Sequence, residues 1–326
     1  MIMKKNLTLL LTLTLGINSY AQISDNDKKT ASSIEISHLK ENLYKIASDE
    51  FEGRKTGEKG QKLAAQFIRD YYKKIGIPSL KGTEDYFQPI PGEFMKRLFS
   101  PKLNDSENVI AYLEGSEFPN EYIVVSSHYD HVGMANGEIY NGADDNASGT
   151  TGVMELALLF KKEKDKGNGP KRSIIFLHCT GEEFGLHGSR YFTSNPLVPL
   201  ENIKANINVD MIGRIDAKYK DNGNYIYVVG SLEEGKHLYE YMEESNNDFT
   251  KMKIDYTYDD RKHPEMIFYR SDHYNFAKND IPVLFFHSGE HEDYHKPTDT
   301  ADKISFDWMR KRIQLIYLTT LRAANE

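Results

Sequence analysis

Five short segments of this chain, spread over roughly 170 residues, combine histidines with a surplus of aspartates and glutamates. Imidazole nitrogens and carboxylate oxygens are the ligands that zinc uses in proteins when no thiolates are involved. Each segment alone is a weak signal, but together they predict a site that binds divalent metal ions and performs hydrolysis. The segments are Ser127–Asp130, Gly142–Asn146, Gly181–Gly185, Asn208–Met211 and Asp293–His295.

Three of these segments contain details that favour two metal ions over one. His128 and Asp130 share a face of an extended chain, so the carboxylate of Asp130 is expected to accept a hydrogen bond from the second ring nitrogen of His128. Asp144 lies at the expected start of a helix, where its two oxygens are placed to bridge two cations about 3.5–4 Å apart. Glu182 and Glu183 point in different directions, so one carboxylate is available to bind metal and the other to act as a general base.

Apolar stretches that are typical of strands come before the candidate residues. Four such stretches are followed along the chain by the segments that contain His128, Glu183, Asp210 and His295. In open α/β sheets, sites form at the carboxyl ends of the strands, so these side chains are expected to converge. The four stretches are 122–126, 173–177, 205–209 and 282–286.

The rest of the chain also alternates between strands and helices. This alternation predicts an α/β fold with a mixed, mostly parallel central sheet and helices on both faces. Residues 81–106 are rich in glycine, proline and aromatic residues and are expected to form an irregular excursion. The other expected strands are 109–113, 225–229 and 254–258, and the expected helices are 34–47, 60–75, 147–164, 188–192, 232–249, 272–278 and 306–323.

The motif series resembles that of the co-catalytic zinc aminopeptidases, metallopeptidase family twenty-eight. This family includes the bacterial leucyl aminopeptidases and aminopeptidase Y, with glutamate carboxypeptidase and glutaminyl cyclase as relatives. The resemblance runs from about Ile34 to the C-terminus and implies the zinc-dependent exopeptidase fold. The similar motifs, in the family's order, are His128–Gly133, Gly142–Gly149, Glu182–Leu186, Asn208–Gly213 and Tyr294–Asp299, together with the turn Ser48–Arg54 and the segment Arg270–His273.

The resemblance also implies a ligand set for two Zn²⁺ ions per chain. One zinc ion would be held by His128 and Asp210 and the other by Glu183 and His295, with Asp144 bridging them.

Further roles follow from the same resemblance. Glu182 would be the general base for the attacking water, and Asp130 would orient His128. Tyr294 matches a tyrosine that some members use to stabilise the oxyanion, and Arg270 is a candidate for substrate binding.

The function expected from this reading is removal of N-terminal residues from peptides. A carboxypeptidase or dipeptidase on the same metal site is one alternative, and a glutaminyl cyclase is another. Asp145 matches the peptidase pattern, from which the cyclase branch departs. A metal-free binding module would be expected to have lost ligands, and a calcium protein would not use two imidazoles. His131 is expected to be structural, because the metal ligands are complete without it.

The N-terminal residues predict export. Lys4 and Lys5 precede an apolar run at 7–16, and Ser19 and Ala21 then offer small residues at a cleavage site before Gln22. We therefore expect a signal peptide at residues 1–21 and a single zinc peptidase domain at 22–326, in the periplasm or outside the cell.

Composition narrows the range of partners. The net charge of −8 and the absence of a long basic run argue against nucleic acid. The resemblance to the zinc aminopeptidases implies peptide substrates as partners. The apolar run at 7–16 is too short to span a bilayer, and Cys179 is the only cysteine. We therefore expect no membrane anchor and no internal disulfide. No obligate protein partner is inferred from the sequence.

Overall fold

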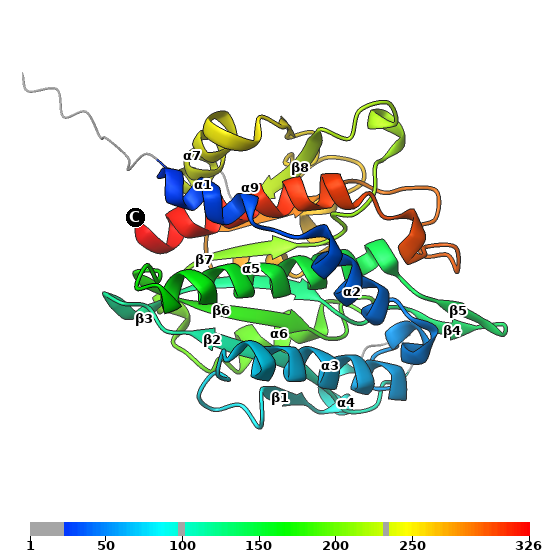
Figure 1. The fold of residues 1–326 in the computed structure, drawn as a ribbon. Helices are drawn as coiled ribbons and strands as arrows, with labels where there is room; N and C mark the ends of the chain where they lie inside the picture. The colour runs from blue at the N-terminus through cyan, green and yellow to red at the C-terminus, as the bar shows by residue number, and fades with distance from the viewer. Residues whose placement is uncertain (1–22, 97–101, 231–234) are drawn as a thin grey trace, which may run out of the picture.

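The computed structural model describes residues 23–96, 102–230 and 235–326 (Figure 1). The expected signal peptide lies outside these residues, and its cleavage site stays a prediction. Among the described helices, none is long and apolar enough to cross a membrane.

A sheet of eight strands forms the centre of the molecule, in the order β1-β2-β6-β3-β7-β10-β8-β9. Its middle four strands, β6, β3, β7 and β10, pair in parallel, whereas β1, β2 and β8 each run antiparallel to a neighbour. The expected mixed, mostly parallel sheet is therefore confirmed. The strands are β1 (Phe87–Ile90), β2 (Ser106–Leu113), β3 (Phe118–His128), β6 (Arg172–Cys179), β7 (Ile203–Val209), β8 (Tyr225–Gly230), β9 (Lys253–Asp255) and β10 (Val283–His287).

Helices cover both faces of this sheet. Ile123 and Val125 of β3 belong to a core with the helices drawn in front of the sheet in Figure 1, among them α3, α5 and α9. Val124 points to the other face, where it joins a core with Phe192 of α6 and Phe276 of α8. The helices are α1 (Asp25–Ser32), α2 (Ile36–Ile46), α3 (Lys59–Ile75), α4 (Gly92–Met95), α5 (Gly149–Asp165), α6 (His187–Ser194), α7 (Lys236–Ser245), α8 (His273–Ala277) and α9 (Phe306–Asn325).

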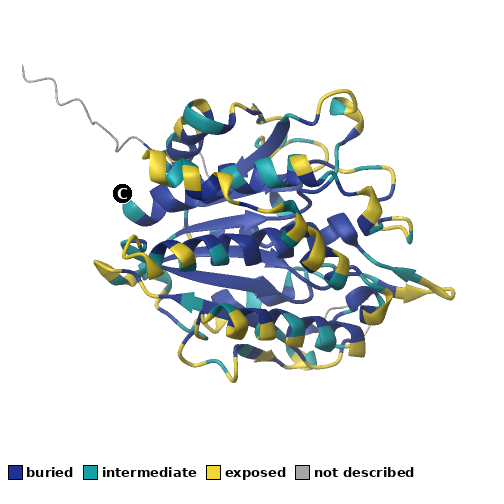
Figure 2. Cartoon of the chain, in the orientation of Figure 1, coloured by how far each residue is buried: buried dark blue, intermediate teal, exposed yellow. Residues whose placement is uncertain are grey.

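Burial follows this layered arrangement. The sheet is buried between the helical layers, while the outward faces of the helices are exposed (Figure 2). Both faces of the middle strands are covered, which fits their long apolar runs, although β7 also buries Asn206 and Asn208.

Three regions differ from the expectation. The stretch 81–106 is not wholly irregular, since β1 pairs with β2 at the edge of the sheet and α4 follows it. No helix was expected before residue 34, but residues 25–32 form α1, whose first turn is capped by the side chain of Ser24. A small hairpin, formed by β4 (Gly133–Ala135) and β5 (Glu138–Tyr140), follows His131.

Candidate metal centre

The candidate ligands meet where the four parallel strands end. His128 is the last residue of β3, and Asp210 directly follows β7. Glu183 lies in the loop after β6, and His295 lies in the loop after β10. Neighbouring parallel strands present their carboxyl ends at one edge of the sheet, which is why these loops converge.

The carboxylate of Asp145 stands between the two histidines. Its Oδ1 lies 3.2 Å from Nε2 of His128, and its Oδ2 lies 3.0 Å from Nε2 of His295. Asp210 approaches the first histidine with Oδ1 at 3.3 Å, and Glu183 approaches the second with Oε2 at 3.0 Å. The site therefore consists of two imidazole–carboxylate pairs that share one aspartate.

These separations fit zinc coordination. Ligand atoms about 2.0–2.1 Å from one tetrahedral zinc ion lie about 3.3 Å from one another. The donor atoms of His128, Asp145 and Asp210 all lie within 4.8 Å of one another. The set of two imidazoles and three carboxylates also matches the donors that zinc accepts.

The charges at the site favour a cation. Burial acts to lower the pKa of His128, but the charges of Asp210 and Glu182 and the contact with Asp145 raise it well above its ordinary value. Burial acts in the same way on His295, and contact with the carboxylates of Asp145 and Glu183 raises its pKa to about 10. Without metal, the carboxylates thus hold protons on the two imidazoles, and a metal ion would take the place of those protons.

The bridging position expected for Asp144 is occupied by Asp145 instead. Asp144 accepts a hydrogen bond from the backbone N–H of Gly213 with Oδ1 at 2.6 Å, and its Oδ2 faces Nε2 of His291 at 3.3 Å. Its side chain is fully buried, and it contacts Gly213 and His291 and not His128 or His295. The structure therefore does not bring Asp144 between the two histidines as expected, and Asp145 lies there instead.

Asp130 also contacts His128 differently from the expectation. Nδ1 of His128 donates to the backbone carbonyl of Asp130 at 3.2 Å, whereas the carboxylate of Asp130 lies 3.8 Å away. That carboxylate accepts hydrogen bonds from Thr56 Oγ1 at 2.7 Å and from the backbone N–H of Glu182 at 3.2 Å. The backbone carbonyl of Asp130 therefore orients the imidazole of His128. The side chain of Asp130 holds the loop that carries Glu182.

Glu182 lines a pocket beside the candidate ligands, together with Asp145 and Asp210. Burial raises the pKa of Glu182 well above its ordinary value, the charges of Glu183 and Asp210 add to this effect, and His128 opposes it. A carboxylate with a raised pKa is suited to accept and return protons near neutral pH.

Two side chains that the sequence reading left without a role anchor these ligands. Ser271 Oγ donates to Oδ2 of Asp210 at 2.7 Å, which leaves Oδ1 to face His128. The carboxylate of Asp299 accepts the backbone N–H groups of Asp144 at 3.0 Å and Asp145 at 3.1 Å. Both residues lie within motifs that resemble the family, but their hydrogen-bond partners are far away in the sequence.

Arg54, in the charged turn Ser48–Arg54, also holds loops of the site in place. Its fully buried guanidinium donates to the carbonyls of Ile46, Tyr129, Asn141 and Gly142 at 2.7–2.9 Å. It therefore joins the loop after β3 to the loop that leads into Asp145. Burial lowers the pKa of Arg54 to about 10, and the charges of Asp145 and other carboxylates oppose this effect.

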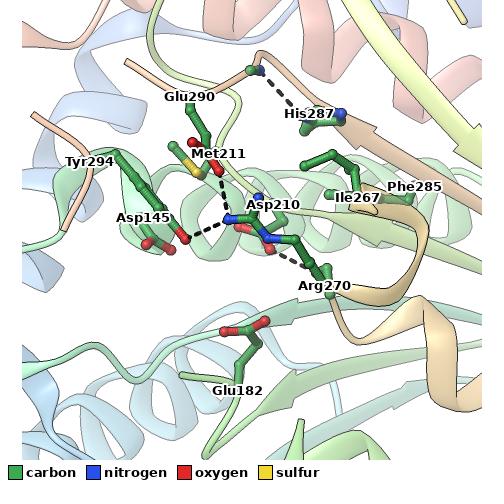
Figure 3. Close-up of a pocket in the computed structure, with 12 residues that line it drawn as sticks. Asp145, Glu182, Asp210, Met211, Ile267, Arg270, Phe285, His287, Glu290 and Tyr294 are labelled. Carbon is green, nitrogen blue, oxygen red and sulfur yellow. Dashed lines mark hydrogen bonds and ion pairs between the residues drawn. The ribbon is translucent and has the colours of Figure 1, made fainter. Parts of the chain in front are cut away.

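Tyr294 and Arg270 lie on the opposite wall of the pocket from Glu182 (Figure 3). Nη2 of Arg270 contacts Oε1 of Glu290 at 2.6 Å and Oη of Tyr294 at 3.3 Å. Burial and the charges of Asp145, Glu183 and Glu182 raise the pKa of Tyr294, so its hydroxyl keeps its proton. Apolar side chains of Ile267 and Phe285 also line this wall.

Known proteins resemble part of this chain in sequence and most of it in fold. A probable zinc metalloprotease of Pyrenophora teres f. teres is 38% identical over 109 residues, which are 32% of this chain and 22% of that protein. The LapA aminopeptidase of Legionella pneumophila has a similar fold, with a TM-score of 0.70, 18% identity, and coverage of 94% of this chain and 76% of that one. A glutaminyl cyclase of Bacteroides thetaiotaomicron also shares the fold, with a TM-score of 0.63, 16% identity, and coverage of 89% and 97%.

The family assignment rests on a longer match. The sequence profile of Peptidase family M28 matches residues 108–320, a stretch that contains every candidate ligand. This match confirms the resemblance seen in the motifs, and it covers more than half of the chain. The chain therefore belongs to peptidase family M28.

Proposed function

We propose that this protein is a two-zinc aminopeptidase that removes residues one at a time from the free N-terminus of peptides. The observation that carries the proposal is the position of Asp145, whose two oxygens face His128 and His295 separately. One zinc ion would be held by His128 and Asp210, the other by His295 and Glu183, and Asp145 would contact both. When bound, the two zinc ions supply Lewis acidity and lower the pKa of water.

Glu182 would act as the general base. It lines the pocket beside the proposed ligands, and its raised pKa suits proton exchange. In the proposed reaction it takes a proton from the attacking water and returns it to the amine that leaves. The protonated hydroxyl of Tyr294, on the opposite wall, would donate a hydrogen bond to the oxygen of the scissile carbonyl as negative charge develops there.

The pocket favours a free amino terminus over a free carboxylate. Asp145, Asp210, Glu182 and Glu290 all line it, so a positively charged α-amino group would be attracted. Within the described part of the chain, Arg270 is the only arginine or lysine that lines the pocket, and it is already paired with Glu290. A substrate carboxylate would therefore have to compete for that arginine.

A peptide panel tests this proposal. One good substrate is compared as the free peptide, as the N-acetylated peptide and as the C-terminal amide. Acetylation is expected to remove most of the turnover and amidation to change it little, with a difference on the order of 10²-fold or more. The opposite pattern would indicate a carboxypeptidase. Cyclisation of an N-terminal glutamine with release of ammonia, without cleavage of other peptides, would indicate a glutaminyl cyclase.

We also propose that the protein is exported. The proposal rests on the two lysines, the apolar run and the small residues near Ala21. Mass spectrometry of the protein from its native host is expected to show Gln22 as the first residue. A chain that retains Met1 would contradict export by cleavage.

A further inference from the structure

His131 contacts a proposed zinc ligand but is not needed to complete the ligand set. Its Nδ1 lies 2.6 Å from Oε1 of Glu183, and the ring is fully buried. Gly142 packs directly against this ring, since a Cβ atom there would lie 2.5 Å from the imidazole. The ring also packs edge-on against the ring of His295, with centroids 5.7 Å apart. His131 is thus held in one orientation, with Nδ1 toward Glu183.

The contact has the length of a hydrogen bond. The donor atoms of His131 lie within 4.8 Å of those of Asp145 and Glu183, and Nδ1 is 3.7 Å from Oδ2 of Asp145. Its distance to Oε1 of Glu183, 2.6 Å, is shorter than the about 3.3 Å expected between two donor atoms on one zinc ion, so the geometry favours a hydrogen bond over direct coordination. The other ring nitrogen, Nε2, is buried and has no hydrogen-bond partner among the described residues. If Nδ1 bound zinc, the proton would have to sit on Nε2 without an acceptor. With the proton on Nδ1 instead, the buried N–H has an acceptor, the carboxylate of Glu183.

The same arrangement occurs at the other half of the site. Ser271 donates to Oδ2 of Asp210, so that Oδ1 faces His128. His131 contacts Oε1 of Glu183, and Oε2 faces His295 at 3.0 Å. In each half, one carboxylate oxygen is fixed by a neighbouring donor and the other is presented to the metal position. Partners of this kind orient metal ligands and influence metal affinity.

We propose that His131 is a positioning residue that holds Glu183 for the second zinc ion through an Nδ1–H···Oε1 hydrogen bond. This inference rests on the proposed two-zinc function. It gives His131 a specific role where the sequence predicted only a structural one. The zinc ion at Glu183 and His295 should depend on His131, whereas the zinc ion at His128 and Asp210 should not.

The test uses three variants and measures zinc binding without substrate. His131→Leu removes the donor, and His131→Asn retains an N–H group near the position of Nδ1. His38→Leu is the matched control, since Nδ1 of His38 makes a contact of the same length, 2.6 Å, with Oε2 of Glu155, between α2 and α5. Metal-free proteins are titrated with zinc against a competing chelator, and thermal unfolding is followed with and without zinc.

His131→Leu is expected to lower the affinity for the zinc ion at Glu183 and His295 by about 10–100-fold. The affinity for the zinc ion at His128 and Asp210 should stay unchanged. His131→Asn should recover most of this loss, and His38→Leu should bind both ions as the wild type does, whatever its melting temperature. Unchanged binding in His131→Leu, an equal loss of both ions, or no recovery in His131→Asn would overturn the inference. So would a zinc-bound crystal structure in which Nδ1 of His131 contacts the metal directly. A wild type that binds two zinc ions but cleaves no peptide would contradict the proposed function alone.

Discussion

The carboxylate of Asp299 accepts the backbone N–H of Asp145 at 3.1 Å. Asp299 lies four residues after His295, so a single loop supplies one proposed ligand and holds the peptide of another. The same carboxylate also accepts the N–H of Asp144, and all of these groups are buried. The two halves of the site are therefore connected in two ways. The carboxylate of Asp145 faces both histidines, and the backbone N–H of Asp145 is bonded to Asp299 in the loop that carries His295.

Replacing Asp299 should loosen this connection. In Asp299→Ala two buried N–H groups lose their acceptor, at a cost of about 1–3 kcal/mol for each. We expect a lower melting temperature and weaker binding of both zinc ions, because Asp145 contacts both positions. Asp302→Ala, which removes an exposed carboxylate from the same loop, is the control and should change neither quantity. Zinc titration and thermal unfolding check both variants.

The adjacent aspartates should differ sharply when each is changed to asparagine. Asp145→Asn replaces one of the two oxygens that face His128 and His295, so we expect at least one zinc ion to be lost. Asp144→Asn keeps an acceptor for the N–H of Gly213 and should retain both ions. Metal analysis after gel filtration measures the difference. Loss of zinc from Asp144→Asn alone would contradict the shared role of Asp145.

Substitutions of the two adjacent glutamates should also have different effects, one on turnover and the other on zinc binding. Glu182→Gln removes the proposed general base and should lower turnover by about 10²–10⁴-fold while leaving the zinc content close to that of the wild type. Glu183→Ala removes a proposed ligand and should lower zinc affinity as well. If the two variants bind zinc equally well, the division of roles within the pair is wrong.

Zinc affinity should rise with pH. In the metal-free protein the pKa of His295 is about 10 and that of His128 lies well above its ordinary value, so both imidazoles carry protons near neutral pH. Zinc binds only the unprotonated imidazoles, so binding must release protons and becomes more favourable as the pH increases toward 10. Calorimetry at pH 7 in buffers of different ionisation enthalpy should report proton release. Binding without proton release would contradict these raised pKa values.

Much of the fold follows from local patterns in the sequence. Stretches rich in apolar residues predicted the buried parallel strands, and the candidate residues beyond them lie at one edge of the sheet as expected. The polar stretch around Asp25–Ser32 did not show its helix, because only Thr30 and Ala31 are buried in it. Strand β1 was missed because Phe87–Ile90 contains a proline and pairs only at the edge of the sheet.

The residue types of the site were predictable from the sequence, but the direction in which each side chain points was not. The residue types identified His128, Glu183, Asp210 and His295 as ligand candidates, and all four meet in the structure. Sequence spacing does not determine which of two adjacent aspartates turns inward before α5. In the structure the side chain of Asp144 accepts a hydrogen bond from the backbone N–H of Gly213, which lies 69 residues further along the chain.

The most direct test of the two-zinc site is anomalous diffraction at the zinc edge, from crystals of protein purified without chelator. We predict two zinc peaks, one beside His128 and Asp210 and the other beside His295 and Glu183. The two oxygens of Asp145 should each contact one of them. A single peak, or a pair of peaks bridged by another carboxylate, would contradict the account.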